Sequence, residues 1–237
     1  MPRYFALVPA AGGGSRFGAA MPKQYAMLAG APVLAQTLTR LQQGPQLDGL
    51  FVVLATEDRE YERMGPQSNV VTALRCGGET RAATVANALS TLAATCADDD
   101  WLLVHDAARP CVPRDALSRL VEHLHDDNVG GLLAIPVADT LKRSDRDADA
   151  PRVSTTEPRA HLWLAQTPQM FRFGVLRRAF TAPGALLVTD EAQAVEALGK
   201  KPRLIPGSPE NIKITYPADL ALATAILAAQ RTGETTR

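Results

Sequence analysis

Apolar runs of strand length alternate with helical patterns along most of this 237-residue chain, and this alternation limits the possible folds more than any other feature. We expect strands at residues 4–10, 50–55, 69–74, 130–138 and 202–207, and a strand that runs out into a loop at residues 101–110. We expect helices at residues 32–43, 80–94, 114–126, 174–180, 190–198 and 217–230. The strands are rich in Val, Leu and Ala without a clean polar alternation, which indicates burial on both faces. The sequence therefore predicts an α/β fold in which a mostly parallel, twisted sheet is flanked by helices.

The alternation stops between Thr140 and Thr167, where the sequence is charged at first and then carries only short patterns. A disordered insertion would explain this stretch, and so would a β-hairpin that projects from the domain; we favour the hairpin. Because the chain shows neither an internal repeat nor a clear linker, we expect one domain over residues 1–237, with a β-arm at residues 139–167.

Composition and charge argue against several classes of protein. The chain is 46% hydrophobic and 21% charged with a net charge of zero, which is typical of a globular protein and gives no support for a nucleic-acid-binding face. No apolar run approaches the ~20 residues that span a bilayer, and the N-terminus lacks a signal-peptide pattern. Three cysteines without CxxC spacing match neither a disulfide framework nor a structural zinc site. We therefore expect a cytoplasmic protein that binds neither nucleic acid nor membrane.

The glycine-rich stretch "PAAGGGSRFGAAMPKQY" directly follows the first strand, where ligands of parallel sheets bind. It is not a dinucleotide fingerprint, because Phe17 stands where glycine is needed, and it is not a P-loop, because Ala19 stands where lysine is needed. Small residues still allow backbone N–H groups to surround phosphate oxygens, although an ordinary turn would also use them. Arg16 and Lys23 fit a triphosphate attacked at its α-phosphorus, where fixed cations stabilise the developing negative charge; ordinary surface cations are the alternative.

Three further segments carry residues with chemical potential. In "VHDAARP", Asp106 follows a strand, where a carboxylate can hold Mg²⁺ against phosphates, and Arg109 can bind a second anion; a turn cap and an exposed arginine are the alternatives. In "CGGETRAAT", two glycines precede a helix N-terminus that can face a base or a phosphate, although a simple helix cap explains the same residues. In "PENIKIT", Lys213 lies in a polar stretch before the last helix.

Together these segments resemble the 2-C-methyl-D-erythritol 4-phosphate cytidylyltransferases of the non-mevalonate isoprenoid pathway. The resemblance extends from Pro9 to Thr215 and includes "PAAGGGSRF", "PKQY", "GGETR", "VHDAARP", "PVADTLKR", "LWLAQTPQMF", "TDEA" and "NIKIT". It implies a single Rossmann-like nucleotidyltransferase domain. It also implies a reaction in which CTP and methylerythritol phosphate give the CDP-linked alcohol and pyrophosphate, with Mg²⁺ or another divalent cation as the cofactor.

The resemblance assigns roles to residues at matching positions. Arg16 and Lys23 match the pair that stabilises the transition state. The positions around the nucleotide are Pro9, Ala10, Ala11, Gly12, Gly14, Gly78, Glu79, Thr84 and Ala107. The positions around the polyol phosphate are Asp106, Arg109, Thr140, Arg159, Thr167 and Lys213, and Asp106 also serves the metal.

The family forms homodimers in which a β-arm from each subunit reaches the active site of its partner. This implies interlocking arms here, with Thr140 and Arg159 placed in the neighbour's pocket. The chain departs from the family pattern at Pro158, where an acidic residue is frequent, and at Glu79, where Asp is common.

Two other functions fit the same residues. A cytidylyltransferase for ribitol 5-phosphate shares the loop and much of the scaffold, so a small polyol phosphate is the acceptor class in either case. A nucleotide-binding module without catalysis is the other alternative. It is disfavoured by the joint presence of Arg16, Lys23 and Asp106, because a binding module needs no cations for a transition state.

Overall fold

The computed structural model describes residues 2–13, 17, 21–65, 67–145 and 150–235, and their chain builds a central sheet covered by helices on both faces. The sheet has the strand order β11-β7-β10-β6-β1-β4-β5. In sequence order these strands are β1 (Tyr4–Pro9), β4 (Gly49–Val53), β5 (Val71–Leu74), β6 (Trp101–Val104), β7 (Gly130–Pro136), β10 (Trp163–Arg172) and β11 (Arg203–Pro206). Each neighbouring pair is parallel except the two pairs made by β10.

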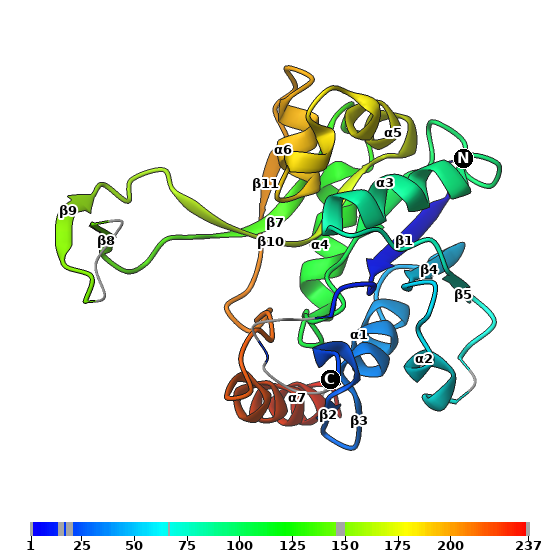
Figure 1. Cartoon of the computed structure of the whole chain (residues 1–237), viewed down its shortest axis with the longest axis horizontal. Helices are drawn as coiled ribbons and strands as arrows, with labels where there is room; N and C mark the ends of the chain where they lie inside the picture. The colour runs from blue at the N-terminus through cyan, green and yellow to red at the C-terminus, as the bar shows by residue number, and fades with distance from the viewer. Residues whose placement is uncertain (1, 14–16, 18–20, 66, 146–149, 236–237) are drawn as a thin grey trace.

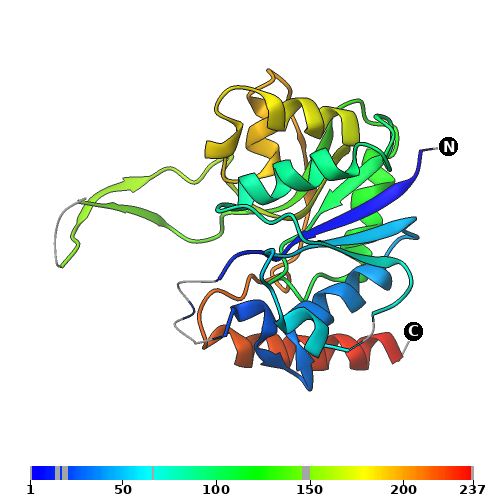
Figure 2. The same cartoon turned by 45° about the vertical axis from the view of Figure 1, so that its right-hand side comes forward.

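Side chains of β1 alternate between two hydrophobic cores, one on each face of the sheet. Phe5 and Leu7 pack in the core that also contains buried residues of α3 (Arg81–Leu92), α5 (Phe173–Thr181) and α6 (Glu191–Glu196). Ala6 and Val8 pack in the core formed with α1 (Val33–Gln42) and α4 (Arg114–Leu124). Figure 2 shows the sheet between these two layers of helices. Because both faces are covered, the inner strands β1, β4 and β6 consist of apolar residues that are largely buried, as the sequence predicted.

A third, smaller core lies under the last helix, α7 (Asp219–Thr235). Ala223 and Leu227 of α7 pack against Leu28, which lies in the short hairpin of β2 (Met27–Leu28) and β3 (Ala31–Pro32). The same core contains Phe17 and the buried Ile214. It therefore fastens the chain on either side of the glycine-rich loop to the C-terminal helix.

The α/β fold with a mostly parallel sheet is confirmed, and each expected strand and helix is present, with ends that differ by up to five residues. Of residues 101–110, the strand occupies only Trp101–Val104, and the loop begins after it. The sequence also missed several elements. Among the described residues, the short ones are η2 (Lys23–Tyr25), α2 (Glu60–Arg63), η3 (Ala185–Leu187) and the two strands of the β2–β3 hairpin.

The larger omission is β10, which lies inside the sheet between β7 and β6 and runs antiparallel to both. Its sequence carries Pro168 and the polar residues Gln166 and Gln169, which are not typical of a central strand. The pairing with β7 shifts register between Ala165 and Gln169, so the proline falls where the ladder is interrupted. The polar side chains are satisfied locally; Gln169, for example, accepts a hydrogen bond from the Ala192 N–H at 2.8 Å.

The segment expected to form an arm contains an antiparallel hairpin of β8 (Leu141–Ser144) and β9 (Val153–Glu157). The hairpin projects away from the body of the protein in both views (Figures 1 and 2). Its C-terminal boundary is earlier than expected, because Trp163 already pairs with Pro136 of β7 and thus belongs to the central sheet. Among the described residues, no helix is both long enough and apolar enough to cross a membrane.

Candidate functional site

A cavity of about 410 Å³ lies at the carboxyl ends of β1 and β6, which are neighbours in the sheet. The next strands after β1, β4 and β5, lie on one side of it, and β6 lies on the other. At such a reversal of strand order the loops that follow the two strands diverge and leave a crevice, which is where open α/β sheets bind ligands. The cavity is lined by Pro9, Ala10, Ala11, Gly12, Lys23, Gln24, Gly78, Glu79, Thr80, Arg81, Thr84, Asp106, Ala107, Ala108, Lys213 and Thr215.

One wall of the cavity is the segment that follows β1. The side-chain amide of Gln24 donates hydrogen bonds to the carbonyl oxygens of Ala10 at 2.8 Å and Gly12 at 3.1 Å. The Ala10 N–H donates to the carbonyl of Val53 at 2.8 Å. Gln24 is buried, so these bonds hold the backbone of residues 10–12 at a fixed position beside the cavity.

The opposite wall is the N-terminus of α3 with the loop before it. The Thr80 hydroxyl caps the helix by accepting a hydrogen bond from the Ala83 N–H at 3.0 Å. The Thr84 hydroxyl, one turn later, accepts a hydrogen bond from the Gly78 N–H at 3.0 Å and donates to the Thr80 carbonyl at 2.9 Å. These bonds fold the loop back onto its own helix, and the N-terminal end of the helix dipole favours negative charge at this wall.

The floor of the cavity is a carboxylate surrounded by cations. Asp106 follows β6 and is buried; its Oδ1 lies 3.0 Å from Arg81 Nε, and its Oδ2 lies 2.8 Å from Lys213 Nζ. Arg109 Nε lies 3.5 Å from the same Oδ2. Burial by itself would raise the pKa of Asp106, but Arg81, Lys213 and Arg109 outweigh burial and hold this pKa far below its usual range. The floor thus contains more positive than negative groups, which suits a ligand with several phosphate charges.

A buried hydrogen-bond network lies beneath Asp106. Its backbone N–H donates to the Thr167 hydroxyl at 3.0 Å, and that hydroxyl lies 3.0 Å from Nδ1 of His105. His105 Nε2 lies 3.0 Å from the Arg109 carbonyl oxygen, so the consistent arrangement has Nε2 protonated and donating while Nδ1 accepts from Thr167. Burial lowers the pKa of His105 to about 4, which keeps the ring neutral at pH 7. The network fixes the backbone from which Asp106 and Arg109 project.

Lys23 reaches across the cavity to the segment before α7. Its ammonium donates to the carbonyl oxygen of Ile214 at 3.0 Å, next to Lys213 in the chain. The Ile214 N–H donates to the Ala108 carbonyl at 2.8 Å, and its side chain is buried in the third core. The backbone of Ile214 therefore connects Lys23 and Lys213 to the loop after β6.

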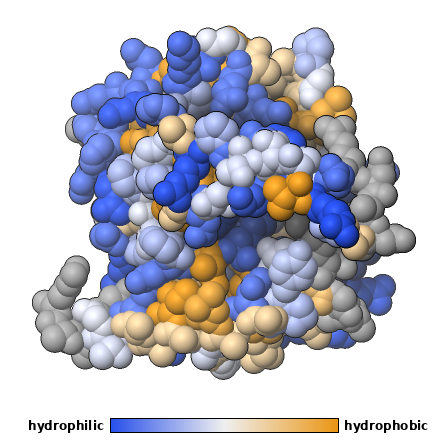
Figure 3. Space-filling view, turned by 90° about the vertical axis from the view of Figure 1, so that its left-hand side faces the viewer, coloured by the Kyte–Doolittle hydropathy of each residue, from blue (hydrophilic) through white to orange (hydrophobic). Residues whose placement is uncertain are grey.

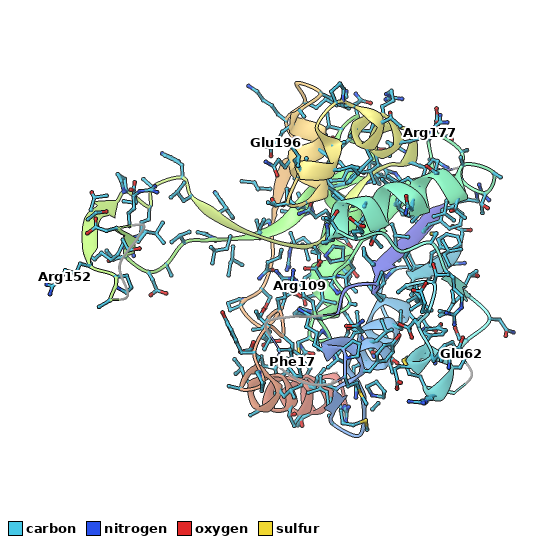
Figure 4. All side chains as sticks on the ribbon, in the orientation of Figure 1. Phe17, Glu62, Arg109, Arg152, Arg177 and Glu196 are labelled. Carbon is cyan, nitrogen blue, oxygen red and sulfur yellow. The ribbon has the colours of Figure 1, made fainter. Side chains whose placement is uncertain are left out.

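Most of the residues singled out from the sequence meet in this cavity. Those that line it are Pro9, Ala10, Ala11, Gly12, Lys23, Gly78, Glu79, Thr84, Asp106, Ala107 and Lys213. Arg109 and Thr167 contact Asp106 as described above; in Figure 4, Arg109 lies within the body of the protein. Gly14 and Arg16 lie outside the described residues.

Two of the singled-out residues do not line the cavity of this chain. Thr140 and Arg159 are exposed residues of the arm segment, and the Arg159 guanidinium donates to the Ala138 carbonyl at the base of the arm. The rest of the arm extends further outward, with Arg152 near its far end (Figure 4). Within one chain, the arm residues and the cavity are therefore separate.

Several residues of the cavity were not singled out from the sequence: Gln24, Thr80, Arg81, Ala108 and Thr215. Gln24 and Arg81 lie inside the quoted segments "PKQY" and "GGETR", so the motif was found but the individual side chain was not. Arg81 also binds the buried Glu191, which is 110 positions away in the sequence and carries no local sign of this contact.

The donor set of the cavity fits magnesium only together with phosphate oxygens. The described residues contain no group of three or more His, Cys, Asp and Glu side chains that would form a cage around a metal. Mg²⁺ usually takes one or two protein carboxylates and completes its octahedron with water and substrate phosphates. Asp106 offers such a carboxylate, although both of its oxygens are bound to cations and one of these contacts would have to be exchanged.

Comparison with known proteins gives one consistent result. The sequence profile of the family described as 2-C-methyl-D-erythritol 4-phosphate cytidylyltransferase matches residues 4–229. A protein of that name from Laribacter hongkongensis (strain HLHK9) is 54% identical over 99% of this chain and 100% of its own length. Another of that name, from Dechloromonas aromatica (strain RCB), is 52% identical over 98% of this chain and 100% of its own length. A crystal structure described as 4-diphosphocytidyl-2C-methyl-D-erythritol synthase superposes with a TM-score of 0.84 at 40% identity, covering 96% of this chain and 99% of the other.

Proposed function

Because the chain belongs to the 2-C-methyl-D-erythritol 4-phosphate cytidylyltransferase family, we propose that it transfers the cytidylyl group of CTP to 2-C-methyl-D-erythritol 4-phosphate. The products are 4-diphosphocytidyl-2-C-methyl-D-erythritol, an intermediate of isoprenoid precursor synthesis, and pyrophosphate. The observation that carries the proposal is the cavity at the reversal of strand order, whose floor gathers Arg81, Arg109 and Lys213 around Asp106.

The reaction needs charge neutralisation and positioning more than acid–base chemistry. A phosphate oxygen of the acceptor forms a bond to the α-phosphorus of CTP, while the bond from that phosphorus to the bridging oxygen breaks and pyrophosphate leaves with the electron pair. A phosphate monoester is largely ionised at pH 7 and is already a nucleophile, so no strong general base is required. Holding both reactants in line and stabilising the added negative charge then supplies most of the rate enhancement.

The two walls of the cavity suit the nucleotide. The fixed backbone at Ala11 and Gly12 and the N-terminus of α3 offer N–H groups to phosphate oxygens or to the base. We assign Lys23 to the charge that develops at the α-phosphate and on the departing pyrophosphate, because it lines the cavity beside this backbone. Arg16 shares this role in the proposal on the basis of its position in the motif.

The floor suits the phosphate of the acceptor. Lys213 and Arg109 present positive groups on the Oδ2 side of Asp106, and the hydroxyl of Thr167 supports the Asp106 backbone. When Mg²⁺ is bound, Asp106 would help to hold it, and the ion would neutralise charge on the triphosphate. We keep magnesium as part of the proposal because the charge of the described residues alone does not match a triphosphate and a second phosphate together.

We also propose that the active form is a homodimer with interlocking arms. The observation in support is that Thr140 and Arg159, which match family positions around the acceptor, lie on an arm that leaves the body of its own chain (Figure 1). A second subunit would bring these residues to a cavity that they do not reach in one chain. Cys76, Cys96 and Cys111 are free thiols, which agrees with a reducing compartment such as the cytoplasm.

Pyrophosphate release tests the proposed substrates. Each of the four ribonucleoside triphosphates is supplied in turn with 2-C-methyl-D-erythritol 4-phosphate and Mg²⁺, and CTP is then repeated with ribitol 5-phosphate as the acceptor. We expect the highest kcat/KM with CTP and methylerythritol phosphate. Higher kcat/KM with ribitol 5-phosphate would assign the other acceptor, and binding of CTP without turnover of either acceptor would make the protein a nucleotide-binding module.

A further inference from the structure

Arg81 joins two carboxylates that come from distant parts of the chain. Its Nη1 and Nη2 lie 2.7 Å and 3.0 Å from the two carboxylate oxygens of Glu191, and its Nε lies 3.0 Å from Oδ1 of Asp106. All three nitrogens of the guanidinium are thus engaged in charge-assisted hydrogen bonds. Because the guanidinium is planar and rigid, these bonds fix its orientation at the edge of the cavity.

Glu191 is a rigid support for this guanidinium. Its side chain is 0% exposed, and it occupies the first turn of α6. That turn is tied to the central sheet, because Gln169 of β10 donates to Asp190 Oδ2 at 3.0 Å and accepts from the Ala192 N–H at 2.8 Å. The position of Glu191 is therefore set by the core of the protein and not by the cavity itself.

The contacts form a line of alternating charges, from Glu191 through Arg81 and Asp106 to Lys213. Burial alone would lower the pKa of Arg81, but the two carboxylates raise it, so the guanidinium stays charged. Since Oδ1 of Asp106 is held by Arg81, Oδ2 remains for Lys213 at 2.8 Å and Arg109 at 3.5 Å. The orientation of the Asp106 carboxylate thus determines where Lys213 and Arg109 are held.

We infer that Glu191, acting through Arg81, is a positioning residue that orients Asp106 and thereby places Lys213 for the phosphate of the acceptor. This inference rests on the proposed function, since it concerns the acceptor half of the same cavity. Without the charge of Glu191, Arg81 retains Asp106 as its single carboxylate partner. Its two Nη atoms then turn toward Asp106, and the Asp106 carboxylate rotates so that Oδ2 moves away from Lys213. The nucleotide wall does not depend on this contact, because the Thr80 cap and the Thr84 hydroxyl hold it.

The test compares Glu191→Gln with Asp100→Asn, a matched control. Asp100 is also a buried carboxylate paired with an arginine, Arg3, at 2.6 Å, but it precedes β6 and lies at the opposite end of that strand from Asp106. Both substitutions remove a buried negative charge and should lower the melting temperature. In Glu191→Gln we expect KM for methylerythritol phosphate to rise about tenfold while KM for CTP changes less than about twofold. In Asp100→Asn both KM values should stay at those of the wild type.

Arg81→Lys, which keeps the charge but cannot bridge two carboxylates, should reproduce the selective rise in KM if Glu191→Gln does not fold. Equal changes in both KM values, or no change in either, would overturn the inference and leave Glu191 a purely structural residue. Crystal structures of the wild type and of whichever variant folds, Glu191→Gln or Arg81→Lys, test the link between Glu191 and Lys213 without an activity measurement. The contact between Lys213 and Asp106 should be lost in the variant, and its retention would contradict the inference. A wild type inactive with every acceptor would instead contradict the proposed function.

Discussion

The carbonyl of Ile214 accepts a hydrogen bond from Lys23, and the neighbouring residue, Lys213, binds Asp106. Two lysines from distant parts of the chain therefore meet at one segment, because Lys213 belongs to it and the next residue, Ile214, holds Lys23. Thr215, the next residue, is fixed in turn by its N–H, which donates to Asp219 at the start of α7 at 2.8 Å. The positions of these two lysines therefore depend on the backbone of residues 213–215 as well as on the carboxylate of Asp106.

Replacing Lys23 with alanine should lower kcat about 100-fold or more, because a fixed positive charge is lost from the wall of the cavity that we assign to the nucleotide. The melting temperature should fall only slightly, since Lys23 is only partly buried and its ammonium donates to a backbone carbonyl, that of Ile214. Steady-state kinetics and thermal unfolding measure the two effects separately. Lys201→Ala, at an exposed position outside the cavity, is the control and should keep the wild-type kcat. Turnover near the wild-type rate in Lys23→Ala would contradict the role of Lys23 in stabilising charge at the α-phosphate.

His105 should make folding stability depend on pH. Its pKa is about 4 in the folded protein, against 6.5 for an exposed imidazole, so as the pH falls the unfolded chain binds a proton first. The contribution of His105 is complete above pH 6.5 and decreases between pH 6.5 and 4. In metal-free buffer, the free energy of unfolding should fall less steeply over this range in His105→Gln, which can still accept from Thr167 and donate to the Arg109 carbonyl. Identical slopes for the two proteins would show that the ring is not held neutral.

At the scale of elements, the two walls of the nucleotide side touch at Gly77. A methyl group at this position would overlap the side chain of Ala11 and lie 2.8 Å from the Leu54 carbonyl oxygen. The Gly77 N–H donates to that same carbonyl at 2.9 Å. The loop before α3 therefore packs directly on the segments that follow β1 and β4, and only glycine allows this approach.

Gly77→Ala should separate the two walls. We expect a loss of about 1–3 kcal/mol of folding stability from overpacking and a rise in KM for CTP. Chemical denaturation and steady-state kinetics provide the measurements. Gly233→Ala, within α7 and with no atom in the way of a methyl group, should leave both quantities unchanged or raise stability slightly. A Gly77→Ala protein with wild-type stability and KM would contradict the close packing.

β1 and β6 could be predicted from the sequence, whereas β10 could not. The first strand and the strand ending before Asp106 were predictable, because their apolar runs and following loops are local patterns. From them the position of the cavity followed, since parallel strands place their loops at one edge. β10 was not predictable in this way, because Pro168 and its buried polar residues resemble a loop until their partners in α6 are known. The same reason hid Glu191, whose role depends on a partner in α3.

At the scale of the whole molecule, the arm is the feature that one chain leaves unexplained. The view along the arm shows apolar side chains among the mostly hydrophilic ones that face the viewer (Figure 3). The exposed large apolar residues in and next to the arm are Val153, Leu162, Trp163 and Leu164. Leu162, Trp163 and Leu164 are consecutive exposed apolar residues, and exposed apolar groups of this kind are typical of surfaces that bind another protein.

Leu164→Glu should therefore shift the proposed homodimer toward the monomer. Leu164 is 52% exposed, so a charge is tolerated by the folded chain but not by an apolar interface. Analytical ultracentrifugation measures the state of assembly, and activity should fall with it, since Thr140 and Arg159 would no longer reach a neighbouring cavity. Leu187→Glu, at a residue that is 87% exposed away from the arm, is the control. An unchanged dimer in Leu164→Glu would remove the arm from the interface.

In the proposed reaction, the enzyme joins the phosphate of methylerythritol phosphate to the α-phosphorus of CTP. Phosphorus NMR of the two substrates mixed with the enzyme and Mg²⁺ tests this reaction directly. With ¹⁸O in the acceptor phosphate, we expect a diphosphate diester and pyrophosphate in equal amounts, with ¹⁸O in the diester and none in the pyrophosphate. Release of inorganic phosphate in place of pyrophosphate, or ¹⁸O in the released pyrophosphate, would contradict it.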